Sequence, residues 1–292
     1  MYNFNSGKEL LEICRTENKK IWEIMLEREI ETTEKSYEEI FEKMTDNIDT
    51  MFNAVEKGLN SDIKSISGLV GGDAKKLKER YKNTKTLSGQ RTLRAVAGAM
   101  SVLEVNSSMG QIVAAPTAGS SGILPGVLYA IKDEFNIEKE DLVKSLFTAS
   151  AIGLVIAKNA TVSGADGGCQ AETGSAAAMA AAALVELEGG EPEESLHAAA
   201  MTIKNILGLV CDPIAGLVES PCVKRNAIGA TNALISADMA LAGIMSIIPF
   251  DEVVDAMYKV GKSLSPNLKE TALGGLAATP TGKKIAKEIF DK

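Results

Sequence analysis

Residues 164–190 read GADGGCQAETGSAAAMAAAALVELEGG, in which a glycine-rich turn and a cysteine precede an alanine-dense run at 176–183. Alanine is the strongest helix former, and its small side chain lets neighbouring helix axes approach closely. A helix that is apolar all round is a buried helix. The stretch therefore predicts a buried central helix at 172–188, around which other helices pack.

The segments on either side have the same helical character. Apolar residues recur at helical spacing, and no run of alternating apolar and β-branched residues indicates a strand. The predicted helices span residues 89–106, 123–134, 139–159, 172–188, 193–209, 227–245, 250–262 and 283–290. We therefore predict an all-α fold built around one large helical domain.

An amphipathic region precedes this domain. Its apolar residues follow one another at steps of four and three, which predicts a helix: Tyr37, Phe41, Met44, Ile48, Met51 and Val55. An earlier amphipathic stretch at 10–30 is expected to pack against it as an antiparallel partner. We expect residues 1–57 to form a helical hairpin appendage, 58–86 a glycine-containing connector made of turns, and 87–292 the catalytic domain.

Composition excludes several classes of partner. The 292 residues are 45% hydrophobic and 24% charged, with a net charge of −8 and a pI near 5.0. Such an acidic chain is poorly suited to nucleic acid or an anionic membrane, so small molecules or other proteins are expected. The N-terminus has no secretory pattern, and the apolar window 227–250 is interrupted by Asn232 and Asp238. We expect a cytoplasmic protein without a membrane span.

Three loops are rich in Gly, Ser, Pro and Asn, at 116–126, 163–169 and 211–233. The second and third contain Cys169, Cys211 and Cys222, spaced C-x41-C-x10-C. This spacing alone is equally compatible with buried, unligated thiols. Each cysteine stands where the chain enters or leaves a predicted helix, and thiols there are expected to be accessible and to ionise readily, as metal ligands must.

These loops carry a family resemblance. PTAGSSGILPGVL, GADGGCQAETGSAAAMAAAALVELEGG, CDPIAGLVESPCVKRNAIGATNA and TALGGLAATPTGKKI together resemble the alpha chain of iron–sulfur-dependent L-serine dehydratases. The resemblance extends over roughly residues 60–292 and includes the hairpin in outline. It implies conversion of L-serine to pyruvate and ammonia without pyridoxal phosphate. It also implies a 4Fe-4S cluster with one open iron, held by Cys169, Cys211 and Cys222, whereas Cys14 would be structural or on the surface.

Other residues are candidates for the substrate and for proton transfer. The loop before residue 123 offers backbone N–H groups and hydroxyls for a carboxylate, although an ordinary glycine-rich cap would look the same. Its candidate binding residues are Thr117, Gly119, Ser120, Ser121 and Gly122. Arg225 and Asn226 either orient substrate or begin a solvated helix. The base is undecided among Lys158, Asp166 and Glu172, and His197, the single histidine, reads as a packing residue.

The resemblance also bears on partners. In the family, a second domain or a separate beta chain brings loops with histidine and serine, and no such segment is recognised here. No cysteine follows Cys222 either. We therefore expect half of a split enzyme, which pairs with a beta subunit in a hetero-oligomer. Three alternatives remain: a pyridoxal-phosphate dehydratase, which requires an α/β fold; an L-cysteine desulfidase-like lyase; and a zinc scaffold that adds Asp212 to the three thiols.

Overall fold

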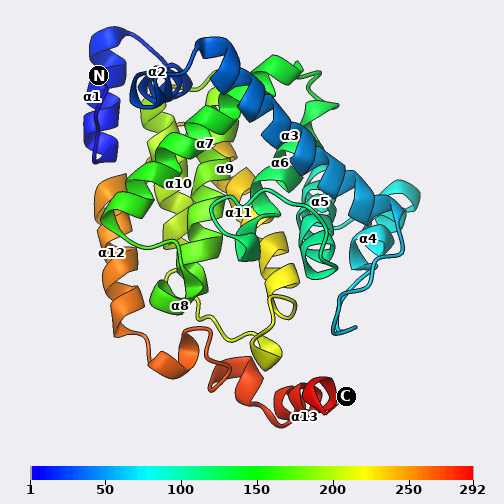
Figure 1. The fold of residues 1–292 in the computed structure, drawn as a ribbon. Helices are drawn as coiled ribbons and strands as arrows, with labels where there is room; N and C mark the ends of the chain where they lie inside the picture. Colours follow the sequence, from blue (N-terminus) through cyan, green and yellow to red (C-terminus); the bar gives the residue numbers. More distant parts are fainter. Residues whose placement is uncertain (1, 292) are drawn as a thin grey trace.

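The structure is a computed structural model that describes residues 2–291. Within this range the chain is all-α, as predicted, and has no strand beyond one isolated bridge between Cys211 and Lys269 (Figure 1). The α-helices are α1 (Gly7–Glu17), α2 (Ile21–Thr33), α3 (Tyr37–Asn60), α4 (Asp73–Asn83), α5 (Gln90–Ser107), α6 (Ile123–Lys132), α7 (Lys139–Asn159), α8 (Gly164–Gly167), α9 (Ser175–Leu187), α10 (Pro192–Lys204), α11 (Cys222–Leu241), α12 (Phe250–Ser263) and α13 (Pro280–Phe290). A π-helix, Gln170–Gly174, leads directly into α9.

The alanine-rich helix lies at the centre of the molecule. Every residue from Ser175 to Glu186 is buried, and α9 packs against α7, α10 and α11 (Figure 1). Methyl side chains on α9 leave room for these helices on all sides. The predicted buried central helix is confirmed, and its N-terminal end carries one of the candidate cysteines.

The N-terminal region differs from the predicted hairpin. It contains three helices, because Asn18 adopts a left-handed conformation (φ 52°) that ends α1 and separates it from α2. Apolar residues from all three helices belong to the same core cluster as α7 and α9, including Leu10, Ile24 and Ile48. Helix α2 packs on α7 and α3 packs on α5. The region expected to be a connector also contains a helix, α4, which packs on α5.

The apolar window at 227–250 is the rest of α11 followed by a loop with exposed Ile244, Met245 and Ile247. Between residues 2 and 291, none of the helices is both long enough and apolar enough to cross a membrane.

Glu186 joins three helices through a buried carboxylate. It lies near the C-terminus of α9 and accepts hydrogen bonds from the backbone N–H groups of Ile21 (2.5 Å) and Trp22 (3.2 Å), and from the hydroxyl of Thr148. The two N–H groups belong to the first turn of α2 and have no partner within that helix. Glu186 therefore caps α2 from a position 165 residues away along the chain.

Replacing Glu186 by alanine should lower the free energy of unfolding by about 1–3 kcal/mol, because buried donors lose their acceptor. Burial raises the pKa of Glu186 above its usual 4.5, so the folded chain holds this proton more tightly than the unfolded chain. Its contribution to stability is fully present below pH 4.5 and decreases as pH rises through the raised pKa. Urea titrations at several pH values across this range should show this pH-dependent decrease in the free energy of unfolding in the wild type and not in Glu186→Ala.

Glu188→Ala is the matched control, since Glu188 lies on the same segment but is exposed. Equal unfolding midpoints for the two variants would contradict the capping role of Glu186.

Candidate active site

The three candidate ligands come from three segments of the chain. Cys169 directly precedes the π-helix that leads into α9, Cys211 lies in the loop after α10, and Cys222 is the first residue of α11. Their exposed fractions are 5%, 3% and 8%. The loop with Cys211 crosses the lower part of the molecule, above the C-terminal segment (Figure 1). The fold thus brings residues separated by up to 53 positions into one buried region.

The electrostatics of the three thiols reflect their mutual proximity. Burial raises the pKa of all three, to about 12 for Cys222, and the charge of Cys169 raises the pKa of Cys211 and Cys222 further. The expectation that these thiols are accessible and ionise readily is therefore wrong for the chain by itself. Burial therefore disfavours the thiolate form at these positions, and a cation bound there would offset this effect.

Hydrogen bonds involve the backbone of Cys211 and the side chain of Cys169. The N–H of Cys211 donates to Leu268 O (2.8 Å), and its carbonyl accepts from the N–H of Glu270 (2.7 Å). The sulfur of Cys169 lies 3.2 Å from the hydroxyl oxygen of Thr173, one turn further along the same helix. The C-terminal segment therefore fixes the position of Cys211.

The donor set suits an iron–sulfur cluster. Soft thiolates select iron–sulfur clusters or zinc. Among residues 2–291 no three His, Cys, Asp or Glu side chains are arranged to hold a single metal ion. Asp212, the fourth ligand of the zinc alternative, is engaged elsewhere, with Arg225 Nη2 and Leu276 N each at 2.7 Å from its oxygens.

A glycine keeps space open beside the thiols. A Cβ atom at Gly164 would lie 2.9 Å from the sulfur of Cys211 and 2.6 Å from a carboxylate oxygen of Glu172. Any larger residue would fill this space or displace its neighbours. The turn at 163–168 therefore lies directly against Cys211 and Glu172.

Of the three candidate bases, only Glu172 lies in this region. It is partly buried, its Oε1 accepts a hydrogen bond from the Thr117 hydroxyl (2.8 Å), and its carboxylate lies between Gly119 and Gly164. Burial raises the pKa of Glu172 above its usual value, and the hydrogen bond from Thr117 opposes this. The carboxylate thus connects the cysteine region to the loop at 117–122.

The other two candidates form contacts elsewhere. Lys158 Nζ donates to Phe4 O (2.7 Å) and Asn5 Oδ1 (3.0 Å), which ties the end of α7 to the N-terminal segment. Asp166 forms an ion pair with Lys262 (2.6 Å) on the surface, which lowers the pKa of Asp166. These contacts place neither the Asp166 carboxylate nor the Lys158 amine beside the cysteines.

The candidate carboxylate loop is held by hydrogen bonds. The Ser121 hydroxyl donates to Ala118 O (2.8 Å), and the Ser120 and Thr117 hydroxyl oxygens lie 3.1 Å apart. Asn226 accepts from Gly122 N (3.1 Å) and donates to Gly119 O (2.8 Å) and Cys222 O (3.0 Å). Because both of its amide hydrogens are used, Asn226 positions the loop against α11 and has no donor left for substrate.

Arg225 connects two of the ligand segments. Its guanidinium donates to Val210 O (2.8 Å) and to Asp212 (2.7 Å), which flank Cys211. Its positive charge also acts on Cys169 and Cys222, where it opposes the rise of the pKa caused by burial. Arg225 is therefore a largely buried counter-charge for the thiol region and not part of a solvated helix start.

Comparison with known proteins identifies the family. Residues 16–277 match the family described as the serine dehydratase alpha chain. The chain is also similar to the probable L-serine dehydratase alpha chain of Bacillus subtilis, with 55% identity over 98% of this chain and 95% of that one. The chain belongs to the serine dehydratase alpha chain family. A second member, the L-serine dehydratase alpha chain of Peptoniphilus asaccharolyticus, is 49% identical over 98% of both chains.

Longer relatives share the same region. The L-serine dehydratase of Helicobacter pylori strain J99 is 37% identical over 95% of this chain, which corresponds to 62% of that protein. The two alpha chains align with this chain along nearly their whole length. The longer H. pylori relative contains additional sequence that has no counterpart in this chain.

The sequence did not point to Gln170, which supports the candidate active site. Its side chain donates to Gly167 O and Met257 O (2.9 Å each) and accepts from Gly208 N (2.9 Å). It thereby ties the glycine turn, α12 and the loop before Cys211 together. A glutamine directly before an apolar, alanine-rich helix was the signal in the sequence, because a polar side chain in such a buried setting needs hydrogen-bond partners.

Proposed function

We propose that this chain is the catalytic alpha subunit of an iron–sulfur L-serine dehydratase that converts L-serine to pyruvate and ammonia. The observation that carries the proposal is that Cys169, Cys211 and Cys222 are all buried and lie near one another, beside the partly buried carboxylate of Glu172. Family membership supports the same reaction, because the related chains are named L-serine dehydratases. The all-α fold supports a reaction without pyridoxal phosphate, whose dehydratases have α/β folds.

Cys169, Cys211 and Cys222 are the ligands in this proposal. When bound, a 4Fe-4S cluster held by three thiolates supplies an iron with an open position, which acts as a Lewis acid toward the hydroxyl and carboxylate oxygens of serine. Arg225 stabilises the charge of the assembled thiolates.

Glu172 is the general base in this proposal and removes the α-proton of L-serine. Its raised pKa brings the carboxyl closer to neutral pH, where a base combines the correct protonation state with sufficient basicity. The Thr117 hydroxyl orients the carboxylate. Loss of the α-proton and of the hydroxyl as water gives aminoacrylate, which tautomerises to an imine and is hydrolysed to pyruvate and ammonia.

The loop at 117–122 binds the substrate carboxylate in this proposal. The first N–H groups of its short helix, Ala118–Ser120, have no acceptor within the helix and are available to an anion. The hydroxyls of Ser120 and Ser121 are bonded within the loop and preserve its shape. Asn226 donates both to this loop and to the backbone of Cys222, so one side chain positions the loop that binds the carboxylate and a residue that binds the cluster.

We also propose that the active enzyme is a hetero-oligomer with a separate beta chain in the cytoplasm. The names of the alpha-chain relatives support a beta chain, and so does the additional sequence in the longer relatives. The four cysteines are free thiols, as in a reducing compartment. Full turnover by the isolated chain, with no increase on addition of a beta chain, would contradict this part.

Exposure to air should abolish pyruvate formation from L-serine, because an iron without a cysteine ligand is open to oxidants and can be lost. Ferrous iron with a reductant should restore the activity, and pyridoxal phosphate should not. Pyruvate formation is followed before aeration, after it and after each addition. Full activity after prolonged aeration, or sulfide release from L-cysteine far faster than pyruvate formation from L-serine, would show that another chemistry operates here.

A further inference from the structure

A large cavity lies next to the loops at 117–122 and 163–168. It has a volume of about 570 Å³, is partly open to solvent and is lined by α2, α3 and α7, with Met179 of α9 in one wall. This volume is within the range of small-molecule sites. Its apolar lining includes three methionines, whose flexible side chains adapt to different ligands; the lining residues are Met25, Ile40, Met44, Phe147, Leu154 and Met179.

Charged and polar groups also line this cavity. The side chains of Lys35 and Lys43, both exposed at the mouth of the cavity, form neither an ion pair nor a hydrogen bond with any residue in the range 2–291. Glu29 uses one carboxylate oxygen for Arg28 (3.0 Å), and Asn47 has only a weak contact with the sulfur of Met44 (3.8 Å). The cavity therefore combines an apolar interior with four polar groups. Two are lysines without a partner, one is a carboxylate and one is an amide.

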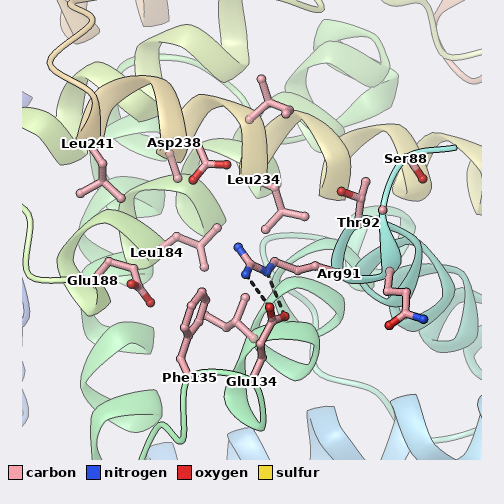
Figure 2. Close-up of a pocket in the computed structure, with 15 residues that line it drawn as sticks. Ser88, Arg91, Thr92, Glu134, Phe135, Leu184, Glu188, Leu234, Asp238 and Leu241 are labelled. Carbon is pink, nitrogen blue, oxygen red and sulfur yellow. Dashed lines mark hydrogen bonds and ion pairs between the residues drawn. The ribbon is translucent and has the colours of Figure 1, made fainter. Parts of the chain in front are cut away.

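The pocket in Figure 2 lacks this combination of groups and serves as a comparison. It has about 410 Å³ and apolar walls, but its only cation, Arg91, is held by Glu134 through two bonds and stacks on Phe135 at 4.6 Å. Asp238 and Glu188 add further negative charge. That pocket offers no free cation to a carboxylate, whereas the cavity beside α2 offers two.

The cavity also contacts the active-site loops directly. Pro116 and Val162 line it, and they immediately precede Thr117 and Ser163. Met179 in its wall belongs to α9, the helix that follows Cys169. A ligand in the cavity therefore touches both loops that flank Glu172.

We propose that this cavity binds an apolar L-α-amino acid as an effector of the enzyme. The ligand's carboxylate pairs with Lys35 and Lys43, its ammonium group pairs with Glu29, and its side chain fills the methionine-lined interior. Both signs of charge at one apolar cavity match a zwitterion better than a fatty acid or an amine. The effect on turnover rests on the proposed function, whereas the binding itself does not.

Thermal unfolding of the anaerobically purified chain tests binding. L-leucine, L-methionine and L-phenylalanine are each added at about 10 mM, and a ligand at about ten times its Kd should raise Tm by roughly 2–4 °C. 4-Methylpentanoate, which lacks the ammonium group, and isoamylamine, which lacks the carboxylate, should each give a smaller shift than L-leucine. The double variant Lys35→Gln, Lys43→Gln should abolish the shift, and Lys85→Gln, which changes an exposed lysine elsewhere, should retain it.

No shift with any of the three amino acids would overturn the proposal, and so would a full shift in the double variant. The effector role is tested by the KM for L-serine, which should change several-fold with the ligand in the wild type and remain constant in the double variant. An unchanged KM beside a clear Tm shift would overturn the effector role. An enzyme assembled with its beta chain that does not turn over L-serine would contradict the proposed function, and the Tm measurements would still decide whether the cavity binds an amino acid.

Discussion

Replacing Glu172 by glutamine is expected to lower kcat for L-serine by about 10²- to 10⁴-fold, the usual contribution of a general base. Glutamine retains the shape of the side chain and can still accept the hydrogen bond from Thr117, but it cannot take up a proton at this step. Because Glu172 is not a ligand, the iron content of the reconstituted enzyme should remain close to that of the wild type. Steady-state kinetics together with iron analysis separate the two effects.

Asp166→Asn and Lys158→Gln are the controls, because both side chains were equal candidates at the level of sequence. Asp166 is paired with Lys262, and Lys158 is bonded to the N-terminal segment, so kcat should stay within a few-fold of the wild type for both. A normal kcat in Glu172→Gln, combined with a large loss in either control, would reassign the base.

The second large effect concerns the thiols. Cys169→Ala, Cys211→Ala and Cys222→Ala should each abolish the brown chromophore after anaerobic reconstitution, because three thiolates provide the whole attachment of the cluster. Visible absorption and iron analysis measure this directly. Activity should be lost in parallel.

Cys14→Ala serves as the control for these variants. Cys14 is buried in α1, and burial raises its pKa to about 12, so it behaves as an inert core residue. This variant should retain the chromophore. A chromophore that persists in all three ligand variants would refute the ligand assignment.

Local sequence signals predicted much of the fold. The helix at 139–159 was predicted with the bounds that the structure has, because apolar periodicity continues from one end of it to the other. Boundaries were missed where a single residue decides them. Asn18 splits the expected helix at 10–30, and the polar α4 has a single buried residue, Ala74, so its sequence resembles a loop.

The site was predicted in part for a similar reason. The cysteines and the loop at 117–122 stand out because of their local glycine and proline context. The choice among Lys158, Asp166 and Glu172 depends on contacts between distant residues, such as Thr117 with Glu172 or Lys158 with Phe4. Such contacts leave no local pattern in a single sequence.

The central claim is that this chain holds a 4Fe-4S cluster on Cys169, Cys211 and Cys222 and uses it to dehydrate L-serine. Iron and acid-labile sulfide analysis of the anaerobically purified chain, with pyruvate formation measured on the same sample after the beta chain is added, tests it most directly. The account predicts about four irons and four sulfides per chain, with activity that rises in proportion to iron content. Zinc in place of iron, or turnover of L-serine by a chain free of iron, would contradict it.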